Sequence, residues 1–193
     1  MVPMIQVLSG TFRHRRLILP KGDQTRPTTS QMRQAVFNIA QHAVEDALFL
    51  DICAGSGSMG IEALSRGASH ATFIDSSHFA IQAIRQNIKT LGLESVTDVL
   101  SGDAVGALKR LQRVYTLVYF DPPYTQKAGE SRLTQEVLTY LDTSPLLAPG
   151  ALIFMEESAQ FSLESLQLTR LQLAGRRRFG NSHLYELVRA STT

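Results

Sequence analysis

An aspartate, two prolines and a tyrosine follow the apolar residues 115–120 as Asp121, Pro122, Pro123 and Tyr124. Proline lacks a backbone N–H and fixes φ, so this tetrapeptide ends a strand and leaves carbonyl oxygens free to accept hydrogen bonds. A carboxylate and free carbonyls suit an exocyclic amine, and the ring of Tyr124 can stack on a planar base. The pattern indicates a pocket for an amine-bearing nucleobase, although taken alone it is also typical of a surface turn.

A glycine-rich segment, residues 54–60, reads AGSGSMG and lies between two stretches of different character. It follows the apolar residues 47–53, which are typical of a buried strand, and it precedes residues 61–64, which favour a helix. Gly55 and Gly57 permit positive φ and a close approach of the backbone to a ligand. This order of strand, glycine loop and helix predicts a cofactor-binding turn of a doubly wound sheet.

Three acids stand at the ends of successive expected strands. Asp51 precedes the glycine loop, Asp75 ends the next strand, and Asp103 follows the third. Asp75 comes about 20 residues after Gly55, where a doubly wound sheet presents an acid to ribose hydroxyls. Acids at three strand ends suit S-adenosylmethionine, which carries an ammonium, a ribose, an adenine and a sulfonium but no phosphate. Each acid taken alone is equally typical of a helix cap or a turn.

The composition indicates one domain with small additions. A chain of 193 residues, of which 44% are hydrophobic, can bury one good core. We find no membrane-spanning stretch and no signal-peptide pattern, so we expect a cytoplasmic protein. The single cysteine, Cys53, excludes an intrachain disulfide, and its apolar neighbours favour a core position over a nucleophile. The five histidines have no metal-ligand spacing, so we expect no metal.

The charge is divided along the chain. Residues 1–45 hold six basic and two acidic residues, residues 46–169 hold eight and fourteen, and residues 170–193 hold five and one. The two ends therefore carry +4 each and the middle carries −6. An acidic centre suits a cationic cofactor, and basic ends beside it suit phosphates. For any one arginine, solubilising charge on an exposed segment is the simpler alternative.

The chain begins with a predicted hairpin of Met4 to Ser9 and Phe12 to Leu19, which turns at Gly10. A capping sequence at residues 28–31 then predicts a helix. Strands and helices alternate after it, which indicates a parallel sheet with helices on both faces. The expected elements cover residues 47–53, 57–66, 70–75, 77–91, 96–101, 103–112, 115–120, 131–142 and 151–155.

The C-terminal segment has a different pattern. Residues 166–173 and 184–188 are typical of strands, and residues 174–181, with Arg176, Arg177 and Arg178, join them. This predicts an antiparallel ending to the sheet. Because loops at the carboxyl ends of parallel strands meet in one crevice, we expect the glycine loop, the acids and the proline turn to share a cleft.

Several parts of the sequence together resemble a known family. They are residues 51–68 (DICAGSGSMGIEALSRGA), residues 121–124 (DPPY), residues 10–17 (GTFRHRRL) and residues 26–28 (RPT). Over nearly its whole length the chain resembles the bacterial 16S ribosomal RNA guanine-N2 methyltransferases of the RsmD type. Two departures are mild, since the family usually has Phe where Cys53 stands and commonly Glu where Asp75 stands.

The resemblance implies an α/β fold, a Rossmann-like class I methyltransferase. It implies a mostly parallel seven-stranded sheet with an antiparallel C-terminal strand, preceded by a small N-terminal β-hairpin and helix. Residues 1–45 are then a basic RNA-binding extension, and residues 46–193 are the methyltransferase domain. The implied activity moves a methyl group from S-adenosylmethionine to the N2 amine of a guanine. The implied partner is 16S rRNA or a small-subunit assembly intermediate, and we expect a monomer.

The roles that follow from the motifs and the resemblance are of three kinds. The expected catalytic residues are Asp121, Pro122, Pro123 and Tyr124. The expected cofactor-binding residues are Asp51, Ala54, Gly55, Ser56, Gly57, Asp75, Ser76, Asp103 and Ala104. The expected RNA-binding residues are Arg13, Arg15, Arg16, Arg26, Thr28 and Arg33, with Arg176, Arg177 and Arg178 as further candidates.

Three other functions stay open at this point. An adenine-N6 or other amino-methyltransferase acting on DNA would use the same catalytic residues, and only the basic N-terminal element argues against it. A nicotinamide-dependent oxidoreductase could use the glycine loop but leaves the proline turn without a purpose. A non-catalytic RNA-binding or assembly factor would have no need of the acids.

Overall fold

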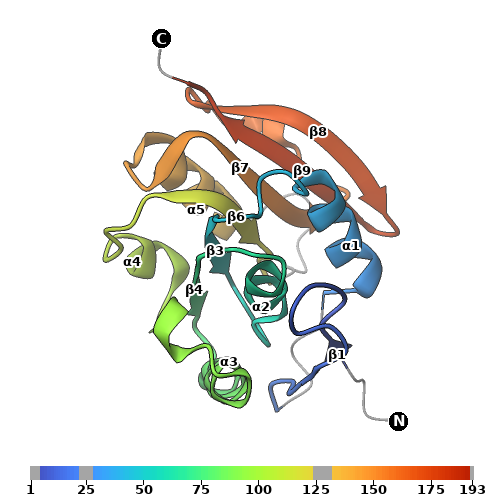
Figure 1. The fold of residues 1–193 in the computed structure, drawn as a ribbon. Coiled ribbons are helices and arrows are strands. Elements are labelled where there is room, and N and C mark those ends of the chain that lie inside the picture. Colours follow the sequence, from blue (N-terminus) through green and yellow to red (C-terminus); the bar gives the residue numbers. More distant parts are fainter. Residues whose placement is uncertain (1–4, 22–27, 124–131, 192–193) are drawn as a thin grey trace.

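The computed structural model describes residues 5–21, 28–123 and 132–191, and its centre is a seven-stranded sheet in the order β5-β4-β3-β6-β7-β9-β8 (Figure 1). A separate two-stranded sheet pairs β1 with β2. The strands are β1 (Ile5–Gln6), β2 (Arg16–Leu17), β3 (Leu48–Ile52), β4 (His70–Asp75), β5 (Thr97–Ser101), β6 (Tyr115–Phe120), β7 (Leu147–Ser158), β8 (Leu171–Phe179) and β9 (Ser182–Arg189).

Five α-helices connect these strands in the described part of the chain. They are α1 (Ser30–Ile39), α2 (Ser58–Ser65), α3 (His78–Leu91), α4 (Ala104–Leu108) and α5 (Arg132–Thr143), and two short 3-10 turns lie at Glu94–Val96 and Leu163–Ser165. The capping sequence predicted for the first helix is confirmed, because the Thr29 hydroxyl accepts a hydrogen bond from the Met32 N–H at 3.1 Å.

The strands β3 to β7 pair in parallel, and β9 pairs antiparallel to both β7 and β8. The mostly parallel sheet with an antiparallel C-terminal strand, and the small N-terminal hairpin and helix, are therefore confirmed. The chain order reverses between β3 and β6, since β4 and β5 extend the sheet to one side and β7 to the other. In an open α/β sheet the crevice at such a reversal is where ligands bind.

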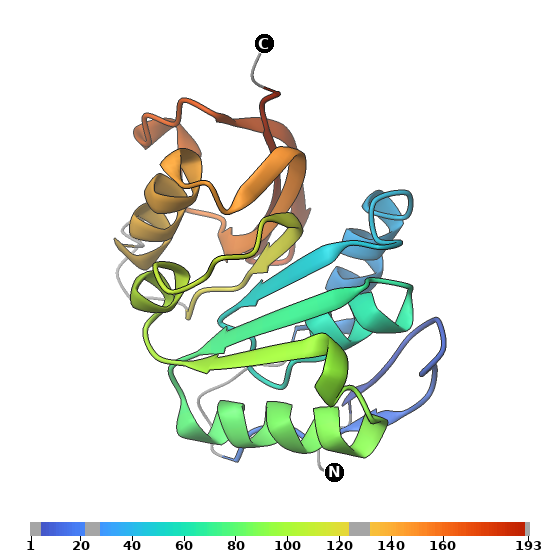
Figure 2. The same ribbon diagram turned by 60° about the vertical axis from the view of Figure 1, so that its left-hand side comes forward.

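Each face of the sheet is covered by its own set of helices (Figure 2). Residues of α1, α2 and α3 pack with Phe49, Leu117 and Tyr119 on one face. Residues of α4 and α5 pack with Val118 and Phe120 on the other. The strands are apolar on both faces because both faces are buried, as expected for parallel strands between helices.

The N-terminal hairpin docks on α2 through one buried carboxylate. Glu62, which is fully buried, accepts hydrogen bonds from the Leu8 N–H at 2.7 Å and the Ser9 N–H at 3.0 Å. Ile5, Val7 and Leu17 of the hairpin lie in the same core cluster as α1, α2 and α3. The hairpin is therefore held rigidly against the sheet's helical layer.

The hairpin strands are shorter than the sequence predicts. Only two residues of each strand pair, whereas Gly10 to Arg15 fold into turns closed by hydrogen bonds from the Arg13 N–H to the Gly10 carbonyl and from the Arg15 N–H to the Phe12 carbonyl. Turn formation and docking onto α2 satisfy these backbone groups, so the ladder has no need to extend.

The C-terminal hairpin is longer than predicted. Residues 174–179 belong to β8, and all of them except Ala174, where the register shifts, pair with β9. The connection is therefore the tight turn at Gly180 and Asn181, and β8 begins at Leu171 rather than at residue 166. Helix α4 ends at Leu108, four residues before the predicted end.

Gly10 lies where the hairpin backbone touches α2. Its φ is +79°, and a Cβ there would lie 1.7 Å from the Ser65 carbonyl oxygen. Gly150 is a matched control, because its φ is +77° and a Cβ added to it would have no atom within 4 Å. We expect Gly10→Ala to lower the free energy of unfolding by about 1 to 3 kcal/mol more than Gly150→Ala, measured by urea denaturation. Equal losses would mean that only the positive φ matters.

Candidate active site

A cavity of about 500 Å³ opens at the carboxyl ends of the central strands. The glycine loop after β3 and the proline turn after β6 both line it, so the shared cleft expected from the sequence is confirmed for these two loops. Its described lining comprises Cys53, Ala54, Gly55, Ser56 and Ser58 after β3; Asp75, Ser76 and Ser77 after β4; Asp121, Pro122 and Pro123 after β6; Glu156 of β7; and Leu19, Pro20, Thr28 and Thr29 before α1.

The glycine loop has a backbone that favours glycine at two points. Gly55 has a φ of +56° and Gly57 a φ of +77°, and a Cβ added to Gly55 would have no atom within 4 Å. A ligand can therefore approach the Gly55 backbone closely. Cys53 also has a positive φ, of 61°; it is partly buried, packs against the core cluster of α4 and α5 as the sequence predicts, and also lines the cavity. Burial raises the pKa of its thiol, which keeps it protonated.

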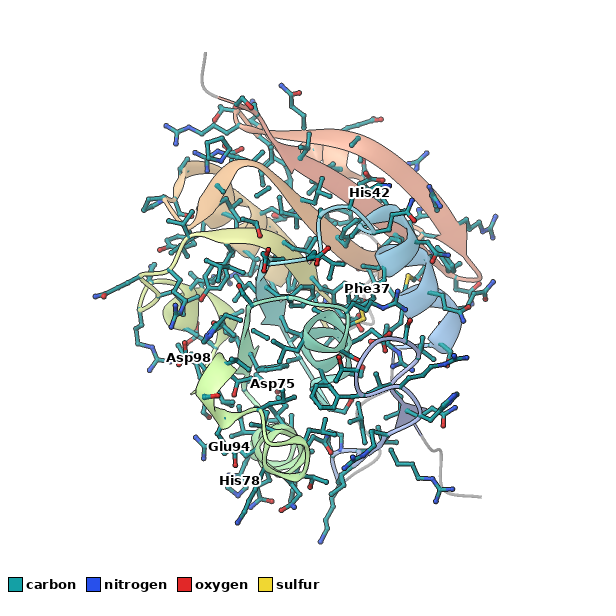
Figure 3. The ribbon with its side chains drawn as sticks, in the orientation of Figure 1. Phe37, His42, Asp75, His78, Glu94 and Asp98 are labelled. Atoms are coloured by element: carbon teal, nitrogen blue, oxygen red, sulfur yellow. The ribbon has the colours of Figure 1, made fainter. Side chains whose placement is uncertain are left out.

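Asp75, labelled in Figure 3, lies at the end of β4 and holds the glycine loop through hydrogen bonds. One carboxylate oxygen accepts the Gly55 N–H at 2.8 Å and the other accepts the Ser77 N–H at 2.8 Å. The residue remains partly exposed on the cavity wall. Its carboxylate can thus receive hydroxyl groups of a ligand while it holds the glycine loop in place.

Asp51 lies beneath the loop rather than on the cavity wall. It is 1% exposed, and its carboxylate accepts the Gly60 N–H at 2.9 Å. This corrects the expectation that Asp51 touches the cofactor directly. Desolvation raises its pKa from 3.8 to about 8, against the opposing effect of the Gly60 hydrogen bond. Gly57 is likewise buried and absent from the described cavity lining.

Asp103 and Ala104 also lie outside the described lining of this cavity. The Asp103 carboxylate caps α4 by accepting the Gly106 N–H at 2.7 Å, which is the alternative role that its position suggests. Ala104, the first residue of α4, is buried on the face of the sheet that α4 and α5 cover. Their contact with an adenine stays a prediction.

Asp121 faces the cavity from the end of β6. Its carboxylate accepts a hydrogen bond from the Thr28 hydroxyl at 3.4 Å, and its N–H donates to the Ile52 carbonyl at 3.3 Å. Desolvation, followed by the charges of Glu156 and Asp51, holds the pKa of Asp121 well above its usual range. A carboxyl with a raised pKa at a cavity can both accept a hydrogen bond and take up a proton. Tyr124 lies outside the described residues.

Glu156 lines the cavity, and no motif in the sequence predicts it as a site residue. It lies on β7, directly after Met155, the register partner of Phe120. The sequence does contain a signal for it. Glu156 directly follows the predicted strand 151–155, just as Asp121 directly follows the predicted strand 115–120. The same position on adjacent parallel strands brings Glu156 and Asp121 into one cavity.

The basic residues expected to bind RNA divide into two groups. Arg13, Arg15 and Arg16 are exposed on the hairpin. Arg33 is fully buried, donates to the Gln6 carbonyl at 3.0 Å and lies 3.8 Å from the Glu62 carboxylate. Its expected contact with RNA is therefore wrong, because it bridges α1, the hairpin and α2 inside the protein.

The other candidates have individual positions. Thr28 lies at Asp121 on the cavity wall, and Arg26 lies outside the described residues. Arg176, Arg177 and Arg178 are exposed on β8. Register partners share a face of the sheet. Arg177 is the partner of Leu184, so it lies on the face covered by α1. Arg176 and Arg178 lie on the opposite face.

Two kinds of feature are absent from the described part of the chain. Among the described residues, no group of three or more histidine, cysteine or acidic side chains is placed to hold a metal ion. In the same part of the chain, no helix is long and apolar enough to cross a bilayer.

Comparison with known proteins identifies the family. The family model described as Conserved hypothetical protein 95 matches residues 5–188. The chain is 32% identical over 175 residues to the Ribosomal RNA small subunit methyltransferase D of Escherichia coli K12. The matched region covers 89% of this chain and 85% of that protein. The chain belongs to this RsmD-type family. The resemblance recognised in the sequence is thus confirmed.

Solved structures agree with this family assignment. The yhhF protein of Escherichia coli is 28% identical with a TM-score of 0.84, over 98% of this chain and 100% of that one. An RNA methyltransferase from Salinibacter ruber, solved in complex with S-adenosyl-L-homocysteine, has a TM-score of 0.64 at 16% identity, over 87% of this chain and 96% of that one. The RsmD-type chain therefore shares its fold with an RNA methyltransferase.

From the raised pKa of Asp51 we predict how the free energy of unfolding of this RsmD-type protein depends on pH. Between its usual pKa of 3.8 and about 8, the folded state holds a proton that the unfolded chain has released. Stability from this group is therefore fully present below about pH 4 and falls as pH rises, by at most about 1.4 kcal/mol per pH unit.

We expect Asp51→Asn, whose amide oxygen can still accept the Gly60 N–H, to flatten this decline. Urea denaturation of both proteins at about pH 5, 6, 7 and 8 measures it. Parallel stability curves for the two proteins would show that Asp51 is ionised throughout this range.

Proposed function

We propose that this protein transfers a methyl group from S-adenosylmethionine to the exocyclic N2 amine of a guanine in 16S ribosomal RNA. The observation that carries the proposal is the shared cavity, which is lined by the glycine loop on one side and by Asp121, Pro122 and Pro123 on the other. Membership of the RsmD-type family, and the ribosomal RNA small subunit methyltransferase among its relatives, support the same substrate.

The residues present fit S-adenosylmethionine. The open space at Gly55 admits a ligand against the backbone, and Asp75 offers carboxylate oxygens on the cavity wall to ribose hydroxyls. Ala54, Ser56 and Ser76 complete this side of the cavity. When bound, this molecule supplies an electrophilic methyl carbon on a positively charged sulfur. A cavity wall with several carboxylates suits that positive charge.

Asp121 holds and prepares the amine. The guanine N2 lone pair is delocalised into the ring, and hydrogen bonds from its N–H groups to Asp121 and to the Pro122 carbonyl draw the protons out of the plane. The lone pair is then localised and oriented, so catalysis is largely positioning and electrostatics. When the nitrogen becomes cationic it loses a proton, and the Asp121 carboxylate, with its raised pKa, is the acceptor. Tyr124 stacks on the base.

The N-terminal segment, residues 1–45, is the RNA-binding extension in this proposal. Arg13, Arg15 and Arg16 are exposed on a hairpin whose following residues, Leu19 and Pro20, line the cavity. Phosphates bound there would lie beside the base-binding site. The substrate is free 16S rRNA or a small-subunit assembly intermediate, and the enzyme acts as a monomer in the cytoplasm.

Nucleoside analysis tests the proposal. The protein is incubated with labelled S-adenosylmethionine and small ribosomal particles that lack the modification, and the RNA is then digested and separated by mass spectrometry. We expect label in N2-methylguanosine. Label in N6-methyladenosine, with DNA as the better substrate, would support the adenine-N6 alternative instead.

The catalytic role of Asp121 leads to a first prediction for turnover. Asp121→Ala should lower kcat by at least about 100-fold, because the amine loses its acceptor and the proton its destination. The affinity for S-adenosylhomocysteine, measured by calorimetry, should change only a few fold. Glu136→Ala, an exposed acid on α5, is the control and should leave both quantities unchanged. Turnover that survives in the Asp121 variant would refute the role.

The hairpin arginines lead to a second prediction, for RNA binding. Arg13→Ala combined with Arg16→Ala should weaken binding and reduce the slope of log K against log salt by about one unit for each phosphate that the variant no longer holds. The control combines Lys109→Ala with Arg113→Ala, since these exposed residues precede β6 at the amino end of the sheet. Equal slopes in both double variants would show that RNA does not cross the hairpin.

A further inference from the structure

A second carboxylate lies in the cavity beside Asp121, and the methyl transfer proposed above assigns it no role. Phe120 of β6 and Met155 of β7 are partners in parallel register. Neighbouring strands lie about 4.8 Å apart, so the residues that follow, Asp121 and Glu156, stand next to one another at the same edge of the sheet. Both line the cavity.

The Glu156 carboxylate is held in place by its surroundings. The Ser182 hydroxyl donates to its Oε1 at 2.8 Å from β9, and the hydroxyl of the buried Tyr119 lies 3.5 Å from its Oε2. Tyr119 is fully enclosed, and its pKa is raised well above its usual value by burial and by the charges of Asp121 and Glu156, so it remains a donor. A carboxylate anchored from two sides can present a lone pair to a ligand in a fixed direction.

Two neighbouring carboxylates select among nucleobases by their hydrogen-bonding edges. The positive charge of S-adenosylmethionine favours the ionised form of both carboxylates, offsetting the raised pKa of Asp121. An ionised carboxylate only accepts hydrogen bonds. Guanine presents two adjacent donors on its Watson–Crick edge, N1–H and the N2 amine. Adenine and cytosine present one amine next to a ring nitrogen that is itself an acceptor. A pair of acceptors therefore matches guanine and repels the other two.

We propose that Glu156 accepts the N1–H of the target guanine while Asp121 accepts from its N2 amine, which makes Glu156 the residue that determines base specificity. This inference rests on the proposed guanine-N2 activity and deepens it. When a buried polar group of a site pairs with the substrate, an analogue that leaves this group unpaired is rejected strongly. An apolar pocket discriminates between similar substrates much more weakly. For the wrong base, the carboxylate would face a ring-nitrogen lone pair.

The alternative is that Glu156 only ties β7 to β9 through Ser182. The two roles predict different responses to the base, because a strand tie affects all substrates alike. The test therefore uses 2,6-diaminopurine, which keeps the N2 amine of guanine but has an unprotonated N1. Particles are assembled from ligated rRNA that carries either guanine or 2,6-diaminopurine at the mapped target position.

The measurement is the ratio of kcat/KM for guanine to kcat/KM for 2,6-diaminopurine, in wild type and in Glu156→Gln. Wild type should favour guanine. In the variant, the amide N–H₂ can donate to the unprotonated N1, so the ratio should fall by about 10- to 100-fold. A ratio is independent of how much of each preparation is folded. Affinity for S-adenosylhomocysteine should stay within a few fold.

Two further variants complete the test. Ser182→Ala removes the tie but keeps the carboxylate, so its ratio should stay near that of wild type. Glu156→Ala is the second variant if Glu156→Gln does not fold; it should also lower the ratio, since both attraction to N1–H and repulsion of the N1 lone pair are lost. If Glu156→Gln lowers both kcat/KM values equally, Glu156 is a structural residue and the inference is overturned. If wild type makes no N2-methylguanosine at all, the proposed function fails, and the specificity role fails with it.

Discussion

The site depends on the parallel pairing of β3 with β6. Ile52 and Phe120 are register partners, and the Asp121 N–H donates to the Ile52 carbonyl at 3.3 Å, so both strands end at the same level. The connections that leave these strands run to helices on opposite faces of the sheet. The glycine loop and the proline turn therefore separate just above the strand ends, and the cavity forms between them. A shift of this register by one residue would also turn Asp121 to the other face.

Carboxylates concentrate at this edge at a cost in free energy. Asp51 and Asp121 both have raised pKa values because protein surrounds them, and their charges oppose one another. The Gly60 N–H and the Thr28 hydroxyl offset part of the cost. In the proposed function a cationic ligand and the donors of a base supply the remaining compensation, so the acids that destabilise the empty site stabilise the occupied one.

The hairpin owes its position to buried polar contacts rather than to its short ladder. Glu62 receives two hairpin N–H groups, and Arg66 donates to the same carboxylate at 2.7 Å. Arg33 adds its contact with the Gln6 carbonyl. Because these contacts fix the hairpin to α2, its exposed arginines are carried at a defined place beside the cavity. Arg33, which anchors the hairpin, is therefore buried rather than exposed.

Local patterns in the sequence by themselves determined the chemistry and most of the elements: the Thr29 cap, the glycine loop, the alternation of strands and helices, and a carboxylate before two prolines. The tertiary structure alone decided three matters. It lengthened β8 through residues 174–179 because β9 supplies hydrogen-bond partners there. It buried Arg33, because Glu62 of another helix lies beneath it. It placed Glu156 beside Asp121, because strand order and register bring together residues far apart in the chain. Residue types and spacing report the groups that a chain carries, but non-local pairing decides which groups face the same cavity.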